Sequence, residues 1–278
     1  MSSKAVAWTL LVAVALATVL LFNYWASFQP LSTLAYTGIA LALCGLANLA
    51  LPFRFLGIRK RAIGALVLAG GVMVALVALL WPAATIRARQ HGSLLDSIMP
   101  EYQFFERHSI RIHARPEQVM QAIRQSTFSD LKSLATLLKI RAAVLRTPFQ
   151  DTGDLQEKRI LDAFLASGYL LGESEHEIIM AGGANVRAKR PLEVHTLQEF
   201  ADYRKPGAVK MAYDFNLEDA GGGWSQISTE TRVLALDDST RRGMGCYWRM
   251  IVPGSGLLRR QWLKGIKERA ERTPKLLP

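Results

Sequence analysis

The sequence predicts an α+β protein in which about three transmembrane helices precede a soluble domain with an antiparallel sheet and a long C-terminal helix. Three observations support this prediction. The first 95 residues contain no Asp or Glu and hold three long apolar runs. Several stretches in the middle alternate apolar and polar residues, as strands with one buried face do. Near the end, Leu258, Trp262 and Ile266 recur at four-residue steps, the spacing of one helix face.

The three apolar runs each approach the roughly 20 residues that a helix needs to cross hydrocarbon. None contains a charged residue, and Trp81 closes the third run at the place where interfacial aromatic residues lie. Lys4 before the first run also fits a cleaved signal peptide, but the run is long, has no A-x-A site and is followed by two more. We therefore predict a transmembrane region over residues 1–85, with spans at about 5–22, 34–53 and 62–81.

Basic residues in short loops predict the orientation, because they favour the cytoplasmic side. The loop after the second run contains Arg54, Arg59, Lys60 and Arg61, whereas the loop from residue 23 to 33 has no charge. This pattern places the second loop inside and the soluble domain on the exoplasmic, or periplasmic, side. Arg87 and Arg89, just after the third run, argue weakly for the opposite orientation.

Residues 86–100 are predicted to be a connector, residues 101–272 a soluble domain and residues 273–278 a tail. The part after the anchor contains all 23 acidic residues and 29 of the 34 basic ones. Such a basic surface is attracted to anionic lipid headgroups, although a solvated basic surface explains it equally well. The chain has two cysteines, Cys44 and Cys246, so a disulfide framework is excluded.

The soluble domain should begin with a strand at 104–114, whose alternation puts Glu106 and His108 on the same side as Ile110 and Ile112. Pro116 suits the first turn of a helix, and Ser129 is expected to cap a second one. Strands follow at 169–172, 177–181, 209–217 and 224–236, the last two forming a hairpin through three glycines. Asp238 is expected to start the terminal helix, which Pro253 and Gly254 should interrupt before Ser255 caps its continuation.

This order, together with the residues at both ends, resembles the SRPBCC or START-like superfamily. The segment FERHSIRIHARPEQVMQAI is similar to the first strand and helix of that superfamily, apart from Arg115, where a small residue or Pro is usual. The closing segments TETRV, RR, YW, PGSGLLRR and KERAE resemble an uncharacterised bacterial branch of it. The resemblance implies a helix-grip fold over about residues 101–272, a curved antiparallel sheet around the C-terminal helix. The resemblance says nothing about the anchor, but the predicted spans together with the bacterial branch predict a multi-pass protein of the bacterial inner membrane.

Members of this superfamily commonly bind a hydrophobic molecule between the sheet and the terminal helix. The resemblance therefore implies a pocket for a lipid or another hydrophobic small molecule, without naming it. Glu106 and His108 are candidates to orient such a ligand, against the alternatives that they lie in solvent or that His108 is a hydrogen-bonded core residue. Tyr247 and Trp248 are candidate pocket aromatics, against plain core. The candidate ligand-binding set is Glu106, His108, Tyr213, Phe215, Thr229, Thr231, Met244, Tyr247 and Trp248.

No strong catalytic motif occurs in the sequence. There is no P-loop, HExxH or CxxC, and the Ser of PGSG does not form a nucleophile elbow. Glu175, His176 and Glu177 alternate across a strand or turn, so they do not predict a metal site. No metal, cofactor or catalytic residue is predicted, and a nucleic-acid partner is not expected because no reader motif is present.

Three functions remain open. The first is a membrane-tethered START-like domain that binds a lipid or other hydrophobic molecule. The second is a polyketide-cyclase-like enzyme that uses Glu106 and His108, which requires both side chains to point into a closed apolar cavity. The third is a non-catalytic interaction protein whose cavity is filled by large side chains. The sequence favours a non-enzymatic role and does not predict an oligomeric state.

Overall fold

The computed structural model describes residues 29–50, 61–88, 92–145 and 156–272, together with Ala17 and Val19. The first predicted span, residues 5–22, lies outside the described residues apart from those two, as does the tail at 273–278. The chain divides into two compact units. Residues 1–82 and 242–253 form the first, and residues 83–241 and 254–278 form the second.

Two helices of the first unit are long and apolar enough to cross a membrane. They are α2 (Pro30–Ala50) and α3 (Arg61–Leu80). Their positions match the second and third predicted spans within a few residues. Large apolar side chains on α3 are exposed, among them Leu66 and Met73, at 73% and 67% of their full area. This exposure is expected of side chains that face lipid tails.

Glycines bring the backbones of α2 and α3 together. A methyl group added to Gly38 would lie 2.5 Å from the backbone N of Ala75, and one added to Gly71 would overlap the backbone of Ala42. Gly45 meets Leu68 in the same way. Such close approach is the common packing mode of helices in a bilayer, where small residues give backbones access to each other.

The segment 242–253 of the terminal helix packs with α2 and α3 in this first unit. The Arg249 guanidinium donates hydrogen bonds to the carbonyl oxygens of Leu79, at 2.5 Å, and Trp81, at 2.7 Å. Leu79 lies in the last turn of α3 and Trp81 directly follows the helix, where carbonyl oxygens have no partner inside the helix. The Tyr36 hydroxyl in turn donates to the Met250 carbonyl at 2.6 Å.

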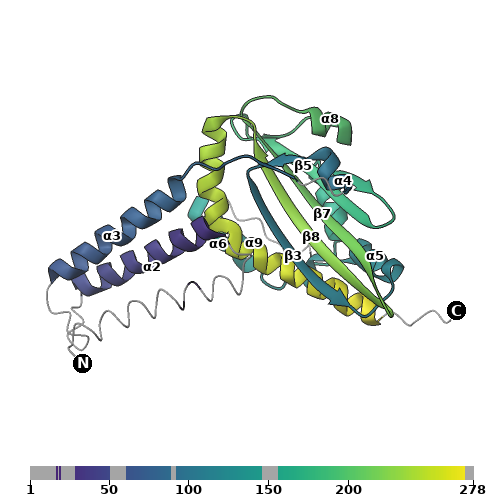
Figure 1. The fold of residues 1–278 in the computed structure, drawn as a ribbon, viewed down its shortest axis with the longest axis horizontal. Helices are drawn as coiled ribbons and strands as arrows, with labels where there is room; N and C mark the ends of the chain where they lie inside the picture. The colour runs from purple at the N-terminus through teal and green to yellow at the C-terminus, as the bar shows by residue number, and fades with distance from the viewer. Residues whose placement is uncertain are drawn as a thin grey trace. The chain divides into compact units, whose positions relative to one another are not determined.

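The second unit is built on a six-stranded antiparallel sheet (Figure 1). Its strand order is β3-β8-β7-β5-β4, and β6 also pairs with β5. The predicted hairpin of β7 and β8 is confirmed. A separate pair, β1 (Ile86–Arg87) and β2 (Glu101–Tyr102), precedes the sheet. The sheet strands are β3 (Phe104–Ile112), β4 (Leu170–Glu173), β5 (Glu177–Asn185), β6 (Arg190–Pro191), β7 (Ala208–Gly221) and β8 (Trp224–Ala235).

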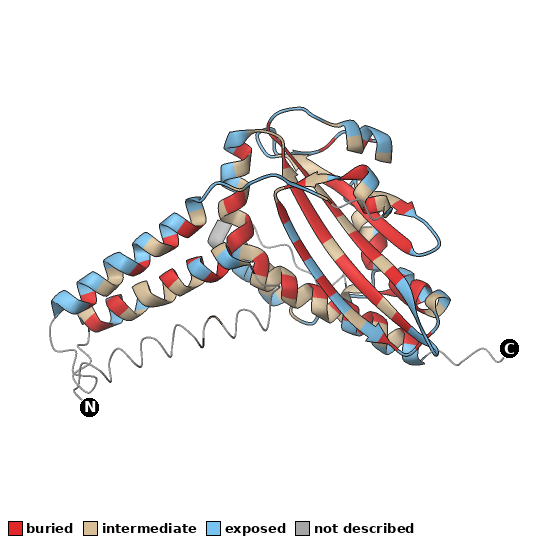
Figure 2. Ribbon diagram, in the orientation of Figure 1, coloured by how far each residue is buried: buried red, intermediate tan, exposed pale blue. Residues whose placement is uncertain are grey.

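Each face of the sheet carries its own hydrophobic core. On one face, Phe215, Ile227 and other strand residues pack against Trp262 and Ile266 of α9 (Asp238–Arg272). On the other face, Ile179 and its neighbours pack against α4 (Leu94–Ile98) and α8 (Leu197–Asp202). Because both faces are covered, most residues of the central strands are buried (Figure 2). The antiparallel sheet and the long C-terminal helix confirm the predicted α+β class.

The helices of the second unit differ from the prediction in detail. α5 (Pro116–Gln125) begins at the predicted proline, and α7 (Ile160–Ala166) precedes β4. Ser129 does not cap a long helix. It lies in a short 3-10 turn (Phe128–Asp130), and α6 (Leu134–Leu145) starts four residues after the end of that turn.

The terminal helix is continuous. The predicted break at Pro253 and Gly254 is absent, and α9 runs through the proline, so Ser255 caps nothing. Its first turn is capped by Asp237 rather than Asp238: the Asp237 carboxylate accepts from the backbone N of Ser239 and Thr240, both at 3.1 Å. The predicted cap was therefore one residue late.

Residues 92–100 of the predicted connector are folded onto the sheet. Its helix α4 points its N-terminal N–H groups at Glu177 of β5, which accepts from the backbone N of Leu94 at 2.7 Å and of Leu95 at 3.0 Å. Arg232 of β8 pairs with Asp96 and with Glu230, both at 2.7 Å. Carboxylates at a helix N-terminus and paired buried charges both stabilise such docking.

Candidate functional site

Polar side chains gather between the sheet and α9. Glu106 and His108 of β3, Thr229 and Thr231 of β8, and Arg259 of α9 lie together here, and we call these five residues the Arg259 cluster. Each exposes 9% or less of its surface. Charged groups are rarely buried to this extent unless they are paired or serve a function.

The strand register explains why four of these side chains are neighbours. Glu106 lies opposite Thr231 and His108 opposite Thr229 in the antiparallel pair of β3 and β8. Residues two apart on a strand share a face, so all four side chains point toward α9. The predicted placement of Glu106 and His108 on the same side as Ile110 and Ile112 is thus confirmed by the alternating burial of β3.

Arg259 joins the cluster from the helix. Its guanidinium donates to the hydroxyl oxygens of Thr229, at 3.2 Å, and Thr231, at 2.8 Å. It also lies over the Tyr213 ring, 4.6 Å from the centroid, a favourable position for a cation. Burial lowers the pKa of Arg259 from its usual value, while Tyr213, Glu106 and Asp214 act in the opposite direction.

Glu106 and His108 form a buried pair. The His108 Nε2 atom lies 2.8 Å from Glu106 Oε1. The second carboxylate oxygen, Glu106 Oε2, is buried and has no hydrogen-bond partner among the described residues. A buried carboxylate oxygen without a donor costs more free energy than almost any other unpaired group. This atom is therefore the feature of the cluster that packing alone does not explain.

Aromatic side chains form a wall beside Arg259. Tyr213 of β7, Phe164 of α7, Tyr169 and Trp262 lie with ring centroids 5.0 to 6.3 Å apart in successive pairs. Phe164, Tyr169 and Tyr213 are only partly buried. Burial against these neighbours raises the pKa of the Tyr169 hydroxyl, so it stays protonated. An aromatic wall with a polar group at one end suits an amphipathic molecule.

Beyond the cluster, the layer between sheet and helix is filled. Phe215, a predicted site residue, is fully buried and packs edge-on against Trp262, with centroids 4.7 Å apart. Ile112, Ile227 and Ile266 complete this part of the core. Phe215 is therefore part of the hydrophobic core next to the Arg259 cluster.

Three predicted site residues lie elsewhere. Met244, Tyr247 and Trp248 belong to the segment 242–253, which forms part of the first unit. The Trp248 indole N–H donates to the Gln29 side chain at 3.2 Å, within that unit. The structure thus groups these three residues with the anchor helices, and their role in lining a pocket stays a prediction.

Arg259 was missed as a site residue because its sequence context gave no signal. It stands in a run of basic residues on a helix, where exposure is the usual outcome. The four-residue step of Leu258, Trp262 and Ile266 predicts a buried face that has Arg259 at its border. In the structure the buried face is formed by Trp262, Leu263 and Ile266, and Arg259 lies at its centre. The available signal lay outside the helix, in Thr229 and Thr231, two candidate site residues whose hydroxyl oxygens can accept from a buried donor.

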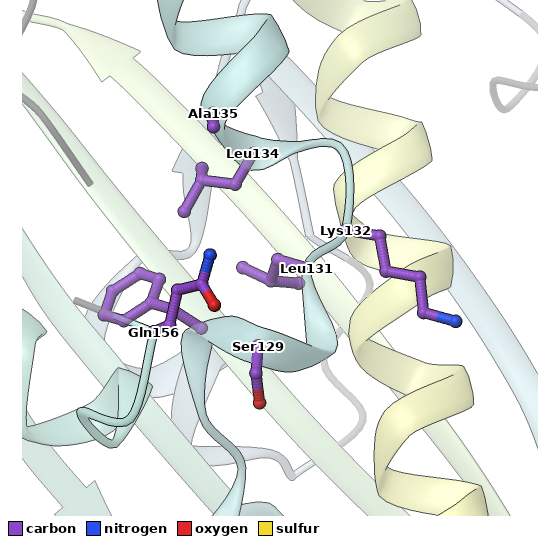
Figure 3. A pocket seen from close by; sticks show the side chains of 7 residues that line it. Ser129, Leu131, Lys132, Leu134, Ala135 and Gln156 are labelled. Atoms are coloured by element: carbon purple, nitrogen blue, oxygen red, sulfur yellow. The ribbon is translucent and has the colours of Figure 1, made fainter. Parts of the chain in front are cut away.

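A separate cavity of about 280 Å³ opens between the 3-10 turn and the start of α6 (Figure 3). Its lining includes Ser129, Lys132 and Gln156 together with Leu131 and Leu134. It contains no residue of the Arg259 cluster. Within the described part of the chain, no group of three or more His, Cys, Asp or Glu could hold a metal ion.

The opposite face of the sheet holds a second buried acid. Asp214 of β7 accepts a hydrogen bond from the backbone N of Glu230 through Oδ1, and burial raises its pKa to about 7. Glu230 and Glu177 raise this pKa further, whereas that hydrogen bond lowers it. The folded protein thus binds this proton more tightly than the unfolded chain does.

Replacing Asp214 by Asn should therefore change the pH dependence of stability. A raised carboxyl pKa means that the wild type loses stability as pH rises from about 4 to about 7. Asn keeps the Oδ1 acceptor and carries no charge, so the variant should gain on the order of 2 kcal/mol relative to wild type between pH 5 and 7. Thermal unfolding at several pH values checks this, with the exposed Asp219→Asn as control. Parallel curves for wild type and Asp214→Asn would contradict it.

The second unit is thus an α+β domain with a buried polar cluster under its terminal helix. No protein-family model matches the chain, and no curated protein matches it. One solved structure, a hypothetical protein from Helicobacter pylori, is 10% identical and has a TM-score of 0.31. The match covers 67% of this chain and 99% of that one. A likeness at this level supports no conclusion about fold or function.

Proposed function

We propose that this chain is a membrane-tethered START-like protein that binds a lipid or another hydrophobic small molecule between its sheet and C-terminal helix. The observation that carries the proposal is the unpaired oxygen of Glu106, buried beside the Arg259 guanidinium. A ligand with a polar end and an apolar body would pair this oxygen and lie along the aromatic wall. The arrangement of α9 against the sheet resembles the helix grip that the sequence suggested.

Energetics support a functional role for the cluster. Apolar residues of similar volume at these five positions would pack without the desolvation cost of two charges, and such replacements are often stabilising. The protein instead places a carboxylate, an imidazole and a guanidinium in its interior. Costly buried charges of this kind concentrate at binding and catalytic sites.

The proposed membrane tether contains one more span than the two apolar helices that the structure describes. We infer that α2 and α3 cross the membrane together with the apolar run at 5–22, which would make the protein multi-pass in a bacterial inner membrane. The basic loop between the second and third runs favours an exoplasmic position of the soluble domain. A domain at the membrane surface would have direct access to lipids.

The Glu106–His108 pair supports a second candidate function. A carboxylate within hydrogen-bond distance of an imidazole is a common acid–base unit, and both side chains are buried, which favours a polyketide-cyclase-like enzyme. The filled part of the layer, with Phe215 against Trp262, instead supports an interaction protein without a cavity. We favour ligand binding, because the unpaired Glu106 oxygen calls for a donor.

The test is to isolate the full chain from its native membrane in mild detergent and identify co-purifying small molecules by mass spectrometry. Wild type should retain one amphipathic species in near-stoichiometric amount. Arg259→Lys should lose most of it, because a lysine cannot reproduce the two-pronged contact with Thr229 and Thr231. Lys264→Met, on an exposed position of the same helix, is the matched control and should retain the species.

A wild-type protein that carries no small molecule would contradict the proposal. The interaction protein would then be the better account. Retention of the species by Arg259→Lys at wild-type level would place the ligand away from the cluster and contradict the proposal as well.

A further inference from the structure

We infer that the ligand's polar end is an uncharged hydroxyl group rather than a carboxylate, a phosphate or an amine. This inference rests on the proposed function and specifies the ligand's chemistry. It is drawn from two features of the Arg259 cluster, the unpaired acceptor on Glu106 and the charges that the cluster already contains.

The first feature calls for a hydrogen-bond donor. Glu106 is 1% exposed, and its Oε1 atom lies within hydrogen-bond distance of His108. Its Oε2 atom has no donor among the described residues. A carboxylate can only accept hydrogen bonds, so the group that completes the site must donate one. An ionised carboxylate on the ligand has no proton to give.

The second feature is the balance of charge. Glu106 and Arg259 carry opposite charges and influence each other through space. Among the described residues they form no direct salt bridge, because Arg259 is directed to the two threonine hydroxyls. An anionic ligand would be attracted by Arg259 and repelled by Glu106. A cationic ligand would be attracted by Glu106 and repelled by Arg259. In a low-dielectric interior either extra charge is costly, whereas a neutral hydroxyl adds none.

A hydroxyl also matches both partners at once. Its proton can be donated to Glu106 Oε2, and its oxygen can accept from a donor of the cluster, such as the Arg259 guanidinium. The apolar remainder of the molecule would then lie along Tyr213, Tyr169 and Phe164. The ligand class is accordingly a long-chain or polycyclic alcohol.

The test uses three probes that share one chain and differ only at the polar end: 1-hexadecanol, hexadecanoate and hexadecylamine. An equimolar mixture is added to the delipidated full chain in detergent, and the bound probes are counted by native mass spectrometry. Wild type should retain the alcohol roughly tenfold over either charged probe, the ratio expected from one unpaired buried charge. Glu106→Gln should reverse the preference toward hexadecanoate, because Arg259 is then the sole charge of the pair. The exposed Glu218→Gln is the matched control and should keep the alcohol preference.

The outcomes separate the two proposals. Preference of the wild type for hexadecanoate or hexadecylamine overturns the hydroxyl inference and leaves ligand binding intact. An unchanged preference in a folded Glu106→Gln variant overturns it too, since Glu106 would not read the polar end. Retention of no probe by the wild type counts against ligand binding itself and therefore against both. The reversal in Glu106→Gln supports both.

Discussion

Replacing Arg259 by Met is expected to destabilise the soluble domain by about 3–5 kcal/mol, the usual effect of leaving one partner of a buried charge cluster alone. The variant removes the hydrogen bonds to Thr229 and Thr231 and leaves Glu106 as a buried carboxylate without a nearby cation. Hydrogen exchange of the β3 and β8 amides in the full chain measures the change. Lys264→Met, with 71% of its side chain exposed, should change the same amides by less than about 0.5 kcal/mol.

A double variant separates charge from packing. If Glu106 is the group left uncompensated, Arg259→Met combined with Glu106→Gln should be at least about 1 kcal/mol more stable than the sum of the single effects. Strict additivity would show that Arg259 acts through its hydrogen bonds and its contacts with Tyr213 and Trp262 alone. It would remove the electrostatic part of the account.

Replacing Gly45 by Leu is expected to separate α2 from α3, at a cost of about 3 kcal/mol, near the upper end for overpacking. A side chain at Gly45 would meet the backbone N and Cα of Leu68, and backbone atoms cannot rotate away as a side chain can. The helices must move apart and lose their contact. Thermal unfolding of the full chain in mild detergent, with hydrogen exchange of the α2 and α3 amides, measures the loss.

Gly70→Leu is the matched control for this prediction. It introduces the same side chain in the same helix pair, but a methyl group at Gly70 meets no atom within 4 Å. Its effect should stay within about 0.5 kcal/mol. Equal destabilisation by both variants would contradict the close-packing account, because Leu has a higher helix propensity than Gly and Gly70 has no neighbour to overlap.

The sequence predicted the sheet side of the site well, because strand alternation has a strict period of two. Placing Ile110 and Ile112 in the core also placed Glu106 and His108 there. The same rule put Thr229 and Thr231 on one face of β8. Once β3 and β8 pair in register, these four residues must be neighbours.

The helix side could not be predicted in the same way. A helix turns by 100° per residue, so its border positions are exposed or buried according to what lies opposite. The sequence placed Arg259 at such a border, but in the structure it lies within the buried face of α9, where two threonine hydroxyls on the facing strand accept its hydrogen bonds. For Met244, Tyr247 and Trp248 the apolar face was real, but periodicity does not say which partner it packs against.

The continuous course of α9 has a similar explanation. Pro253 lacks an N–H and usually ends or kinks a helix, which is why the sequence predicted a break there. In the structure, contacts on both sides hold the helix. Arg249 is bound to the end of α3, and Trp262 donates through its indole N–H to the Ser126 hydroxyl oxygen at 2.8 Å. Tertiary contacts of this kind override a local helix breaker.

The most direct test of the central claim is an experimental structure of the full chain isolated in its native lipids, resolved well enough to show side chains. The account predicts a non-protein molecule between α9 and the sheet, with a polar atom within hydrogen-bond distance of Glu106 Oε2 and an apolar body along Tyr213 and Phe164. A map in which Glu106 Oε2 is paired with a protein donor or a lone water, and protein side chains fill the space beside the aromatic wall, would contradict it.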